Sequence, residues 1–347
     1  MSVSQTSEPN PLVHGGPAPP FPAFRPRWPW LGGDLQTVRN TITHRAPDFS
    51  PYPAERLILP LADGDRLWAL LNRPSRDSGK PLIVLVHGLT GSEDSRNIKT
   101  SAAYHLRRGY PVLRLNLRGA GPSRGQGPQH YHAGRRADLR EAVAALPAPL
   151  KSNGRVLVGV SLGGNMCVKL LGENIGTGDI IAAATVCAPI DLKMAQLRIG
   201  ARRNAVYEHH LLRSMCADAR ARGTPEEILA RVHTVYDFDD LVVAPNNGFQ
   251  NAEDYYRQSS AGPFIDAIQV PTLLVHARTD PWVPARMYLE RIWKDDGAAT
   301  LLLSPGGGHV GFHAADNPQP WHDRCIGMFF DEVVGRRSPL ALRARGA

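Results

Sequence analysis

The sequence has few cysteines and lysines and no long hydrophobic run. Its longest nearly unbroken apolar stretch covers residues 180–190, far shorter than the roughly 20 residues that a membrane-spanning helix needs. Residues 1–16 contain no cationic start followed by an apolar core, so we expect no secretory signal and a cytoplasmic protein. The four cysteines lie far apart, without the paired spacing of a zinc site. We therefore expect buried, reduced thiols, no transmembrane segment, no metal and no other cofactor.

The chain carries a net charge of +8, and only six of its 40 basic residues are lysine. Residues 336–347 contribute four positive charges and no acid, and residues 1–47 contribute a net charge of +2. The rest of the chain is therefore nearly neutral. A basic surface is typical of proteins that bind nucleic acid, but a charge confined to the two ends gives no such indication. We expect no nucleic-acid partner.

Blocks rich in Val, Ile and Leu alternate along the chain with helical segments. Strands that are apolar on both faces, separated by helices, are typical of a parallel sheet covered on both sides. The sequence therefore predicts an α/β fold with a mostly parallel central sheet flanked by helices. The predicted strands are residues 81–86, 112–117, 155–160, 181–187, 272–276 and 300–303, and the predicted helices are residues 101–108, 134–146, 165–173 and 285–293.

Three regions follow from the composition: an N-terminal arm over residues 1–48, one domain over 49–335 and an Arg-rich tail over 336–347. The arm is rich in proline, which cannot join a helix interior or a strand ladder. Exposing large aromatic side chains to water is unfavourable, so we expect an extended arm that lies on the domain. The aromatic side chains expected to pack there are Phe21, Phe24, Trp28 and Trp30.

Residues 191–266 interrupt the alternation, because no buried-strand pattern occurs in them. Helical blocks take their place, including residues 205–221, a capping box that begins at Thr224, and a helix capped by Asn251. We predict a helical cap inserted between two strands of the sheet. Its acidic residues Asp237, Asp239 and Asp240 are expected to pair with arginines or to cap helices.

The strongest chemical signal is the sequence Gly159-Val160-Ser161-Leu162-Gly163-Gly164, which stands between a predicted strand and a predicted helix. A Gly-x-Ser-x-Gly turn in that position holds its serine in a strained, exposed conformation. The start of the following helix directs N–H groups toward negative charge that develops there. We predict that Ser161 is a nucleophile.

A serine nucleophile needs a base, and the base needs a carboxylate to orient it. Asp280 and His309 both follow predicted strands, and the chain order Ser, Asp, His is that of the α/β-hydrolase architecture. Asp191 also follows a strand and remains an alternative acid, and His313 remains an alternative base.

Ester chemistry at a serine also needs two backbone N–H groups that bind the oxyanion. Leu162 follows the nucleophile and supplies one of them. Leu89 supplies the other, because His87-Gly88-Leu89 is a glycine-containing turn directly after the strand 81–86. His87 is expected to support this turn and not to act as a base.

Beyond these residues, the sequence resembles the YheT-like α/β-hydrolases over most of its length. Asp34 departs from the family pattern, which usually has His before Leu-Gln-Thr, and this change concerns only contacts of the arm. The segments that carry the resemblance are residues 30–37 (WLGGDLQT), 87–92 (HGLTGS), 116–121 (NLRGAG), 131–134 (YHAG), 159–164 (GVSLGG), 238–241 (FDDL) and 254–259 (DYYRQS), with the Asp280 and His309 loops.

The resemblance implies hydrolysis of carboxylic esters with short or medium acyl chains, or of acylglycerols. We therefore expect a small-molecule ester or lipid as partner, while peripheral membrane contact and the oligomeric state stay open. A thioesterase or acyltransferase with the same three residues is the alternative. A protein of the α/β-hydrolase fold that binds a ligand without catalysis is a second, less favoured alternative.

Overall fold

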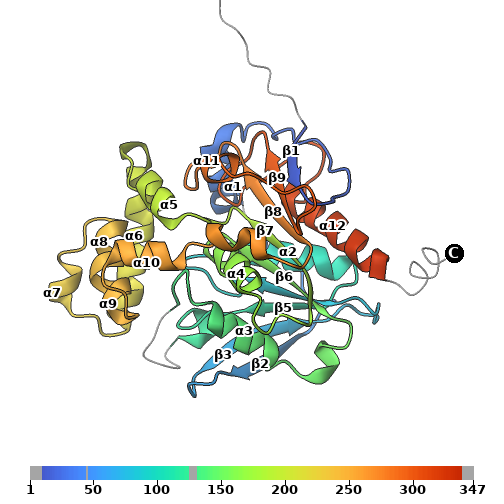
Figure 1. The fold of residues 1–347 in the computed structure, drawn as a ribbon, viewed down its shortest axis with the longest axis horizontal. Coiled ribbons are helices and arrows are strands. Elements are labelled where there is room, and N and C mark those ends of the chain that lie inside the picture. The colour runs from blue at the N-terminus through green and yellow to red at the C-terminus, as the bar shows by residue number, and fades with distance from the viewer. Residues whose placement is uncertain (1–9, 44–45, 125–130, 338–347) are drawn as a thin grey trace, which may run out of the picture.

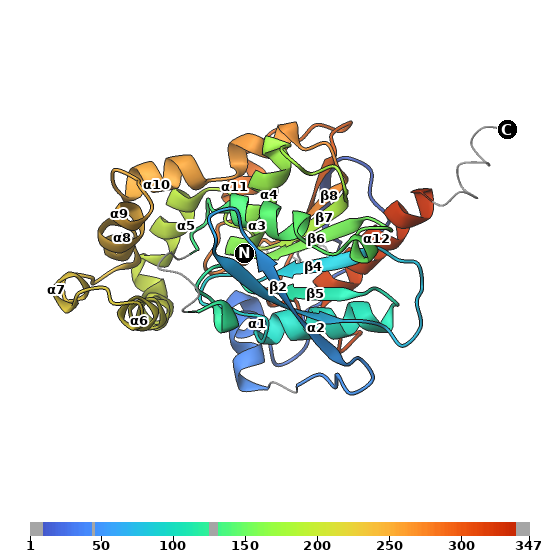
Figure 2. The same cartoon turned by 90° about the horizontal axis from the view of Figure 1, so that it is seen from below.

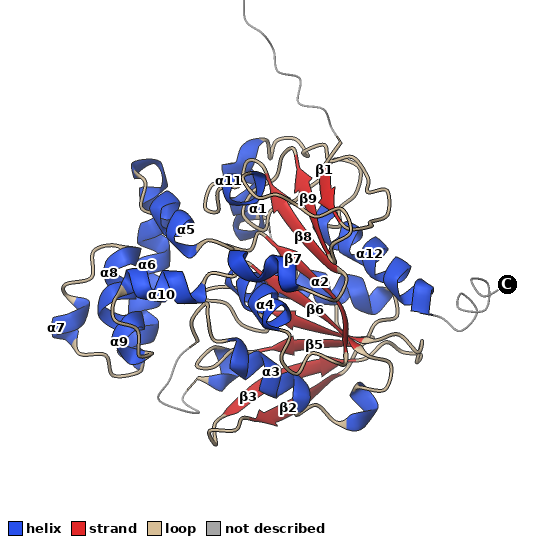
Figure 3. Ribbon diagram, in the orientation of Figure 1, coloured by secondary structure: helices blue, strands red, loops and turns tan. Residues whose placement is uncertain are grey.

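The computed structural model describes residues 10–43, 46–124 and 131–337, and these form a nine-stranded sheet with helices around it (Figures 1 and 3). The strands lie in the order β1-β9-β8-β7-β6-β4-β5-β3-β2. The six from β9 to β5 run parallel, whereas β1, β2 and β3 pair antiparallel. The predicted α/β fold with a mostly parallel sheet is therefore confirmed. The strands are β1 (Leu12–Gly15), β2 (Ala54–Pro60), β3 (Arg66–Asn72), β4 (Leu82–Val86), β5 (Val112–Leu115), β6 (Arg155–Val160), β7 (Ile180–Val186), β8 (Thr272–Ala277) and β9 (Ala299–Ser304).

Helices cover both faces of this sheet because the central strands are apolar on both sides (Figure 2). Successive side chains of a strand point to opposite faces. In β4, Ile83 and Leu85 belong to the apolar cluster shared with α2 (Arg96–Arg107) and α12 (Trp321–Arg337). Val84 and Val86 belong to the opposite cluster, shared with α3 (Arg136–Ala144) and α4 (Leu162–Glu173).

All six predicted strands are present, but the sequence analysis did not predict β1, β2, β3 or α12. β1 and β2 are the edge strands, and most residues of β2 are exposed, so no continuous apolar run marks them. β3 lies between β5 and β2 and contains the apolar run Leu67–Leu71, which the sequence analysis overlooked. The predicted helix at residues 285–293 is also too long, since α11 covers only Arg286–Leu289. Residues 338–347 of the predicted tail lie outside the described residues.

The N-terminal arm contributes both a strand and a helix to the structure, so the expectation of an extended arm is wrong for residues 32–42. β1 pairs antiparallel with β9, and α1 (Gly32–Ile42) begins beyond the proline-rich stretch. Phe24 is buried edge-on against Phe312 and Trp321, as expected for a packed arm. Trp28 is 79% exposed, so the prediction that all four aromatic side chains pack is wrong for this residue, which lies in a turn closed by a hydrogen bond from Trp30.

Between β7 and β8 the described residues are helical and contain no strand, as predicted, and these helices project to one side of the sheet (Figure 1). The longest, α6, covers the predicted residues 205–221. The other elements of this insertion are α5 (Leu192–Ile199), α7 (Glu226–Leu229), α8 (Val235–Phe238), the π-helical turn Asp239–Val243, α9 (Ala244–Asn246), α10 (Ala252–Ser259) and the 3₁₀ segment Gly262–Ala267.

The helix caps of the insertion are partly as predicted. The Asn251 side chain accepts a hydrogen bond from the N–H of Asp254 at 2.9 Å and caps α10. The predicted capping box at Thr224 is wrong, because Pro225 takes the N-cap position of α7 and leaves Thr224 one residue too early. A complete capping box forms at α8, where Thr234 caps the helix. No helix in the described part of the chain is both long and apolar enough to cross a membrane.

Candidate active site

Ser161 lies in the turn that joins β6 to α4, at the carboxyl edge of the sheet. Its backbone has φ 52° and ψ −120°, a conformation that costs a non-glycine residue about 1–3 kcal/mol. The tight turn depends on Gly159, because a Cβ atom there would lie 2.5 Å from the carbonyl oxygen of Gly163. The structure therefore gives Ser161 the strained conformation that the motif predicts.

His309 lies between Ser161 and Asp280. Its Nε2 atom is 2.9 Å from Oγ of Ser161, and its Nδ1 atom is 2.9 Å from Oδ2 of Asp280. An ionised carboxylate only accepts hydrogen bonds, so Nδ1 carries the proton and Nε2 is left to accept the serine hydroxyl proton. The other oxygen of Asp280 accepts the N–H groups of Trp282 at 2.8 Å and Val283 at 2.9 Å. The three predicted residues thus meet with hydrogen-bonding geometry.

Asp280 is buried, yet it is held in its ionised form. Burial alone would raise the pKa of this carboxyl group, but the charge interaction and hydrogen bond with His309 and the N–H of Val283 lower it below its usual range. The indole ring of Trp282 stacks on the imidazole ring of His309, with centroids 4.6 Å apart and planes 23° apart. Charge and stacking together fix the orientation of the imidazole.

The loop that carries His309 is held from two directions. Oγ1 of Thr37, in α1, accepts the backbone N–H of His309 at 2.8 Å. Sγ of Cys187, directly after β7, accepts the N–H of Val310 at 3.4 Å and lies 3.7 Å from the carbonyl oxygen of Gly308. Sequence reasoning missed Thr37 and Cys187, because a single threonine or cysteine carries no local pattern.

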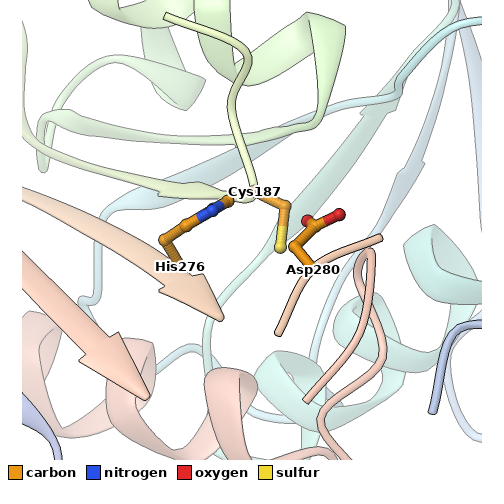
Figure 4. Close-up of side chains that lie close together, drawn as sticks. All are labelled: Cys187, His276 and Asp280. Atoms are coloured by element: carbon orange, nitrogen blue, oxygen red, sulfur yellow. The ribbon is translucent and has the colours of Figure 1, made fainter. Parts of the chain in front are cut away.

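Cys187, His276 and Asp280 form a buried cluster whose ligand atoms lie within 4.8 Å of one another (Figure 4). Their chemistry is poorly suited to a metal ion. Burial, and then the charge of Asp280, raises the pKa of the Cys187 thiol well above its usual range, which disfavours the thiolate that a metal requires. Both oxygens of Asp280 already accept hydrogen bonds, and Nε2 of His276 is 3.1 Å from the Val283 carbonyl oxygen. The cluster is better suited to supporting the site.

The turn after β4 lies directly against the serine. A Cβ atom on Gly88 would lie 3.1 Å from Cβ of Ser161. The ring of His87 braces this turn, since Nε2 accepts the N–H of Leu117 at 3.1 Å and Nδ1 donates to the Gly88 carbonyl oxygen at 2.8 Å. Burial lowers the pKa of His87 to about 4, so the ring is neutral near pH 7.

The two predicted oxyanion donors flank the same serine. Leu89 follows the braced turn, and Leu162 is the first residue of α4, where N–H groups have no partner within the helix. Neither N–H has a hydrogen-bond partner among the residues that the structure describes. Both groups are therefore available to a ligand bound beside Ser161.

The alternative acid and base are occupied elsewhere. The Asp191 side chain accepts the N–H of Met194 at 2.8 Å and caps α5. Nδ1 of His313 is 3.0 Å from a guanidinium nitrogen of Arg39, and burial lowers the pKa of this imidazole to about 3. The structure therefore brings Asp280 and His309 to Ser161, and gives Asp191 and His313 other contacts.

A cavity of about 600 Å³ opens beside Ser161. Its walls come from α1, from the turn after β4 and from the inserted helices, and they are mainly apolar. The carboxyl group of Asp239 is an exception, because it lies in the wall and contacts Tyr256. The expectation that Asp239 pairs with an arginine or caps a helix is therefore wrong, and sequence reasoning assigned no role to Tyr256.

Comparison with known proteins places these residues in a family context. Residues 81–316 match the protein family described as alpha/beta hydrolase fold. A putative esterase, YheT, of Escherichia coli (strain K12) is 32% identical over 306 residues, which cover 84% of this chain and 88% of that protein. A monoacylglycerol lipase of Saccharomyces cerevisiae is 29% identical over 278 residues, 74% of this chain and 61% of the yeast protein. Among solved structures, an esterase of Pyrococcus furiosus shares the fold with a TM-score of 0.58 at 16% identity, over 84% of this chain and 95% of that one.

Proposed function

Since the chain belongs to the YheT-like α/β-hydrolases, we propose that it hydrolyses carboxylic esters through Ser161, His309 and Asp280. The observation that carries this proposal is the continuous hydrogen-bonded path from the serine hydroxyl through both imidazole nitrogens to a buried carboxylate. A hydroxyl is a poor nucleophile until a base takes its proton, and this arrangement supplies the base and its orientation.

In the first half of the reaction, Oγ of Ser161 attacks the ester carbonyl while Nε2 of His309 takes the hydroxyl proton. The negative charge of the tetrahedral intermediate is stabilised by the N–H groups of Leu89 and Leu162. Asp280 stabilises the imidazolium that forms. The intermediate collapses, His309 returns the proton to the leaving alcohol, and the acyl group stays on Ser161.

In the second half, water enters and gives a proton to Nε2 of His309 while its oxygen attacks the acyl-enzyme carbonyl. A second tetrahedral intermediate forms against the same two N–H groups. Its collapse releases the carboxylic acid, and Nε2 of His309 gives its proton back to Oγ, which restores Ser161. The preorganised donors act in both halves because the carbonyl carbon stays at one place.

We propose short or medium acyl esters, including acylglycerols, as the substrate class. Two features support this choice. The cavity beside Ser161, of about 600 Å³, lies within the size range of small-molecule sites, and its mainly apolar wall is suited to a hydrocarbon chain. The yeast relative is named a monoacylglycerol lipase.

The test compares wild type with Ser161→Ala on p-nitrophenyl esters of increasing acyl length, with a fluorophosphonate probe as a second readout. We expect hydrolysis and covalent labelling by wild type, and neither by the variant. Equal hydrolysis by both proteins would refute the mechanism. Folded wild type that neither reacts with the probe nor turns over any ester would favour a ligand-binding protein instead. Thioester and alcohol acceptor assays on the same two proteins separate hydrolysis of oxygen esters from thioesterase and acyltransferase activity.

A further inference from the structure

Asp239 places a carboxyl group in the wall of the cavity beside Ser161, among side chains that are mainly apolar. Phe238, Val235 and Val243 line the same cavity. The residue is 8% exposed, and its Oδ2 atom accepts the hydroxyl of Tyr256 at 2.7 Å. Oδ1 has no hydrogen-bond partner among the described residues, but it is not fully buried, so it is accessible from the cavity. The wall thus contains a carboxyl group with one oxygen bonded to Tyr256 and the other open to a ligand in the cavity.

The neighbouring acids differ from Asp239 because the fold uses them. Asp237 accepts the N–H of Thr234 at 2.9 Å in the capping box of α8. Asp240 accepts the N–H of Ala252 at 2.8 Å. Asp239 makes no such backbone contact through its side chain. Among the described residues, the Tyr256 hydroxyl is therefore the one hydrogen-bond partner of this carboxyl group.

An acid in this position is unfavourable unless something pairs with it. Burial raises the pKa of Asp239 to about 7, against a smaller lowering by the Tyr256 hydroxyl. Asp239 also begins the π-helical turn Asp239–Val243, and such turns are rare and often found at functional sites. An apolar residue of similar size would fill the wall without this penalty. The carboxyl group is better explained by a ligand than by stability.

We propose that Asp239, held by Tyr256, accepts a hydrogen bond from a hydroxyl group of the ester substrate. The substrate class is then a carboxylic ester that carries a free hydroxyl on its alcohol part or on its acyl part. This inference rests on the proposed hydrolysis at Ser161, which lines the same cavity. An ester with a methyl group in the same place removes Oδ1 from water without giving it a hydrogen-bond donor. We therefore expect the cavity to favour the hydroxylated ester over its methyl analogue.

The experiment measures kcat/KM for pairs of esters in which a hydroxyl group is replaced by a methyl group. Hydroxyethyl butyrate against propyl butyrate tests the alcohol part, and ethyl ω-hydroxyhexanoate against ethyl heptanoate tests the acyl part. We expect wild type to prefer the hydroxylated ester by about tenfold or more in one of the two pairs, which is the cost of an acceptor that the bound ester removes from water without pairing it. No preference in either pair would overturn the proposal.

Two variants, Asp239→Leu and Asp239→Ala, test whether Asp239 is the source of the preference. We expect both to lose it, and Asp240→Asn, a matched change of the neighbouring acid, to keep it. The ratio of kcat/KM values does not depend on the amount of folded protein, and fluorophosphonate labelling shows that the site has formed. A preference that survives both Asp239 changes would overturn the inference. If folded wild type hydrolyses none of these esters, that result would instead refute the proposed function.

Discussion

Replacing Asp280 by asparagine tests the orientation of His309 with the smallest change in shape. The carboxylate makes three contacts: Oδ2 accepts Nδ1–H of His309, and Oδ1 accepts the N–H groups of Trp282 and Val283. An asparagine that keeps its oxygen on the two backbone N–H groups turns its NH₂ group toward His309. In the flipped orientation, the NH₂ group would face the two backbone N–H groups of Trp282 and Val283. Two donor–donor contacts would then replace the single one at His309, so the flipped orientation is less favourable. We therefore expect the first arrangement.

With an NH₂ group facing Nδ1, the imidazole must accept at Nδ1 and carry its proton on Nε2. It then cannot take the proton of Ser161. A wrong tautomer of this kind lowers kcat by about 10⁴ in serine hydrolases with intact geometry, which is about 5.5 kcal/mol in the barrier. The assay is kcat for p-nitrophenyl butyrate, with burst kinetics to separate acylation from deacylation and circular dichroism to check folding.

Asp191→Asn is the matched control for this variant. Asp191 also follows a strand, but its side chain caps α5, and asparagine caps a helix as well as aspartate does. We expect nearly wild-type kcat for this protein. The reasoning is refuted if folded Asp280→Asn retains kcat within about tenfold of wild type, and a large loss in Asp191→Asn would point to Asp191 as the orienting acid.

Two further changes test groups outside the three central residues. Thr37→Val removes the acceptor of the His309 N–H, so we expect the free energy of unfolding in urea to fall by about 1–3 kcal/mol and kcat to fall with it; a lower stability with unchanged kcat would limit Thr37 to a structural role. His105 is buried with both ring nitrogens unpartnered among the described residues, and burial lowers its pKa to about 4. The folded protein therefore resists protonation that the unfolded chain accepts below about pH 6.5, and loses stability as the pH falls from there toward 4. We expect His105→Leu to reduce that loss by about 3 kcal/mol in urea unfolding, and an unchanged pH dependence would contradict this.

The sequence predicts the central sheet well because its strands are buried on both faces and give continuous apolar runs. It fails for β2, whose residues are mostly exposed, although β2 and β3 form the antiparallel hairpin that completes one edge. Helix caps show a similar limit. The Asn251 cap is predicted correctly from local sequence. Thr224 is followed by the Pro and Glu residues of a capping box, but α7 begins one residue later than predicted, so Pro225 is its N-cap.

The same distinction applies to the site. Ser161, Asp280 and His309 can be predicted because each follows a strand, and parallel strands end at one edge of a sheet. Thr37 contacts the backbone of His309 across 272 positions of sequence, so only the folded arm reveals it. Asp239 has acidic neighbours that serve as caps and backbone partners, and its different role depends on which side of a π-helical turn faces the cavity.

Backbone strain in this protein is concentrated around the proposed site. Among the described residues, five other than glycine have positive φ. Four of them are Ser161 itself and three residues near it, Thr90, Cys187 and Val310, at φ 51–57°. Each costs about 1–3 kcal/mol, and the β-branched Thr90 and Val310 are the least suited to this conformation. Ser161 and Cys187 each donate their backbone N–H to a residue of the next strand, at 2.8 and 2.9 Å. The hydrogen bonds of the rigid sheet thus offset strain at its carboxyl edge, and this edge is where a serine hydroxyl, an imidazole and two unpaired N–H groups must be held in fixed positions before an ester arrives.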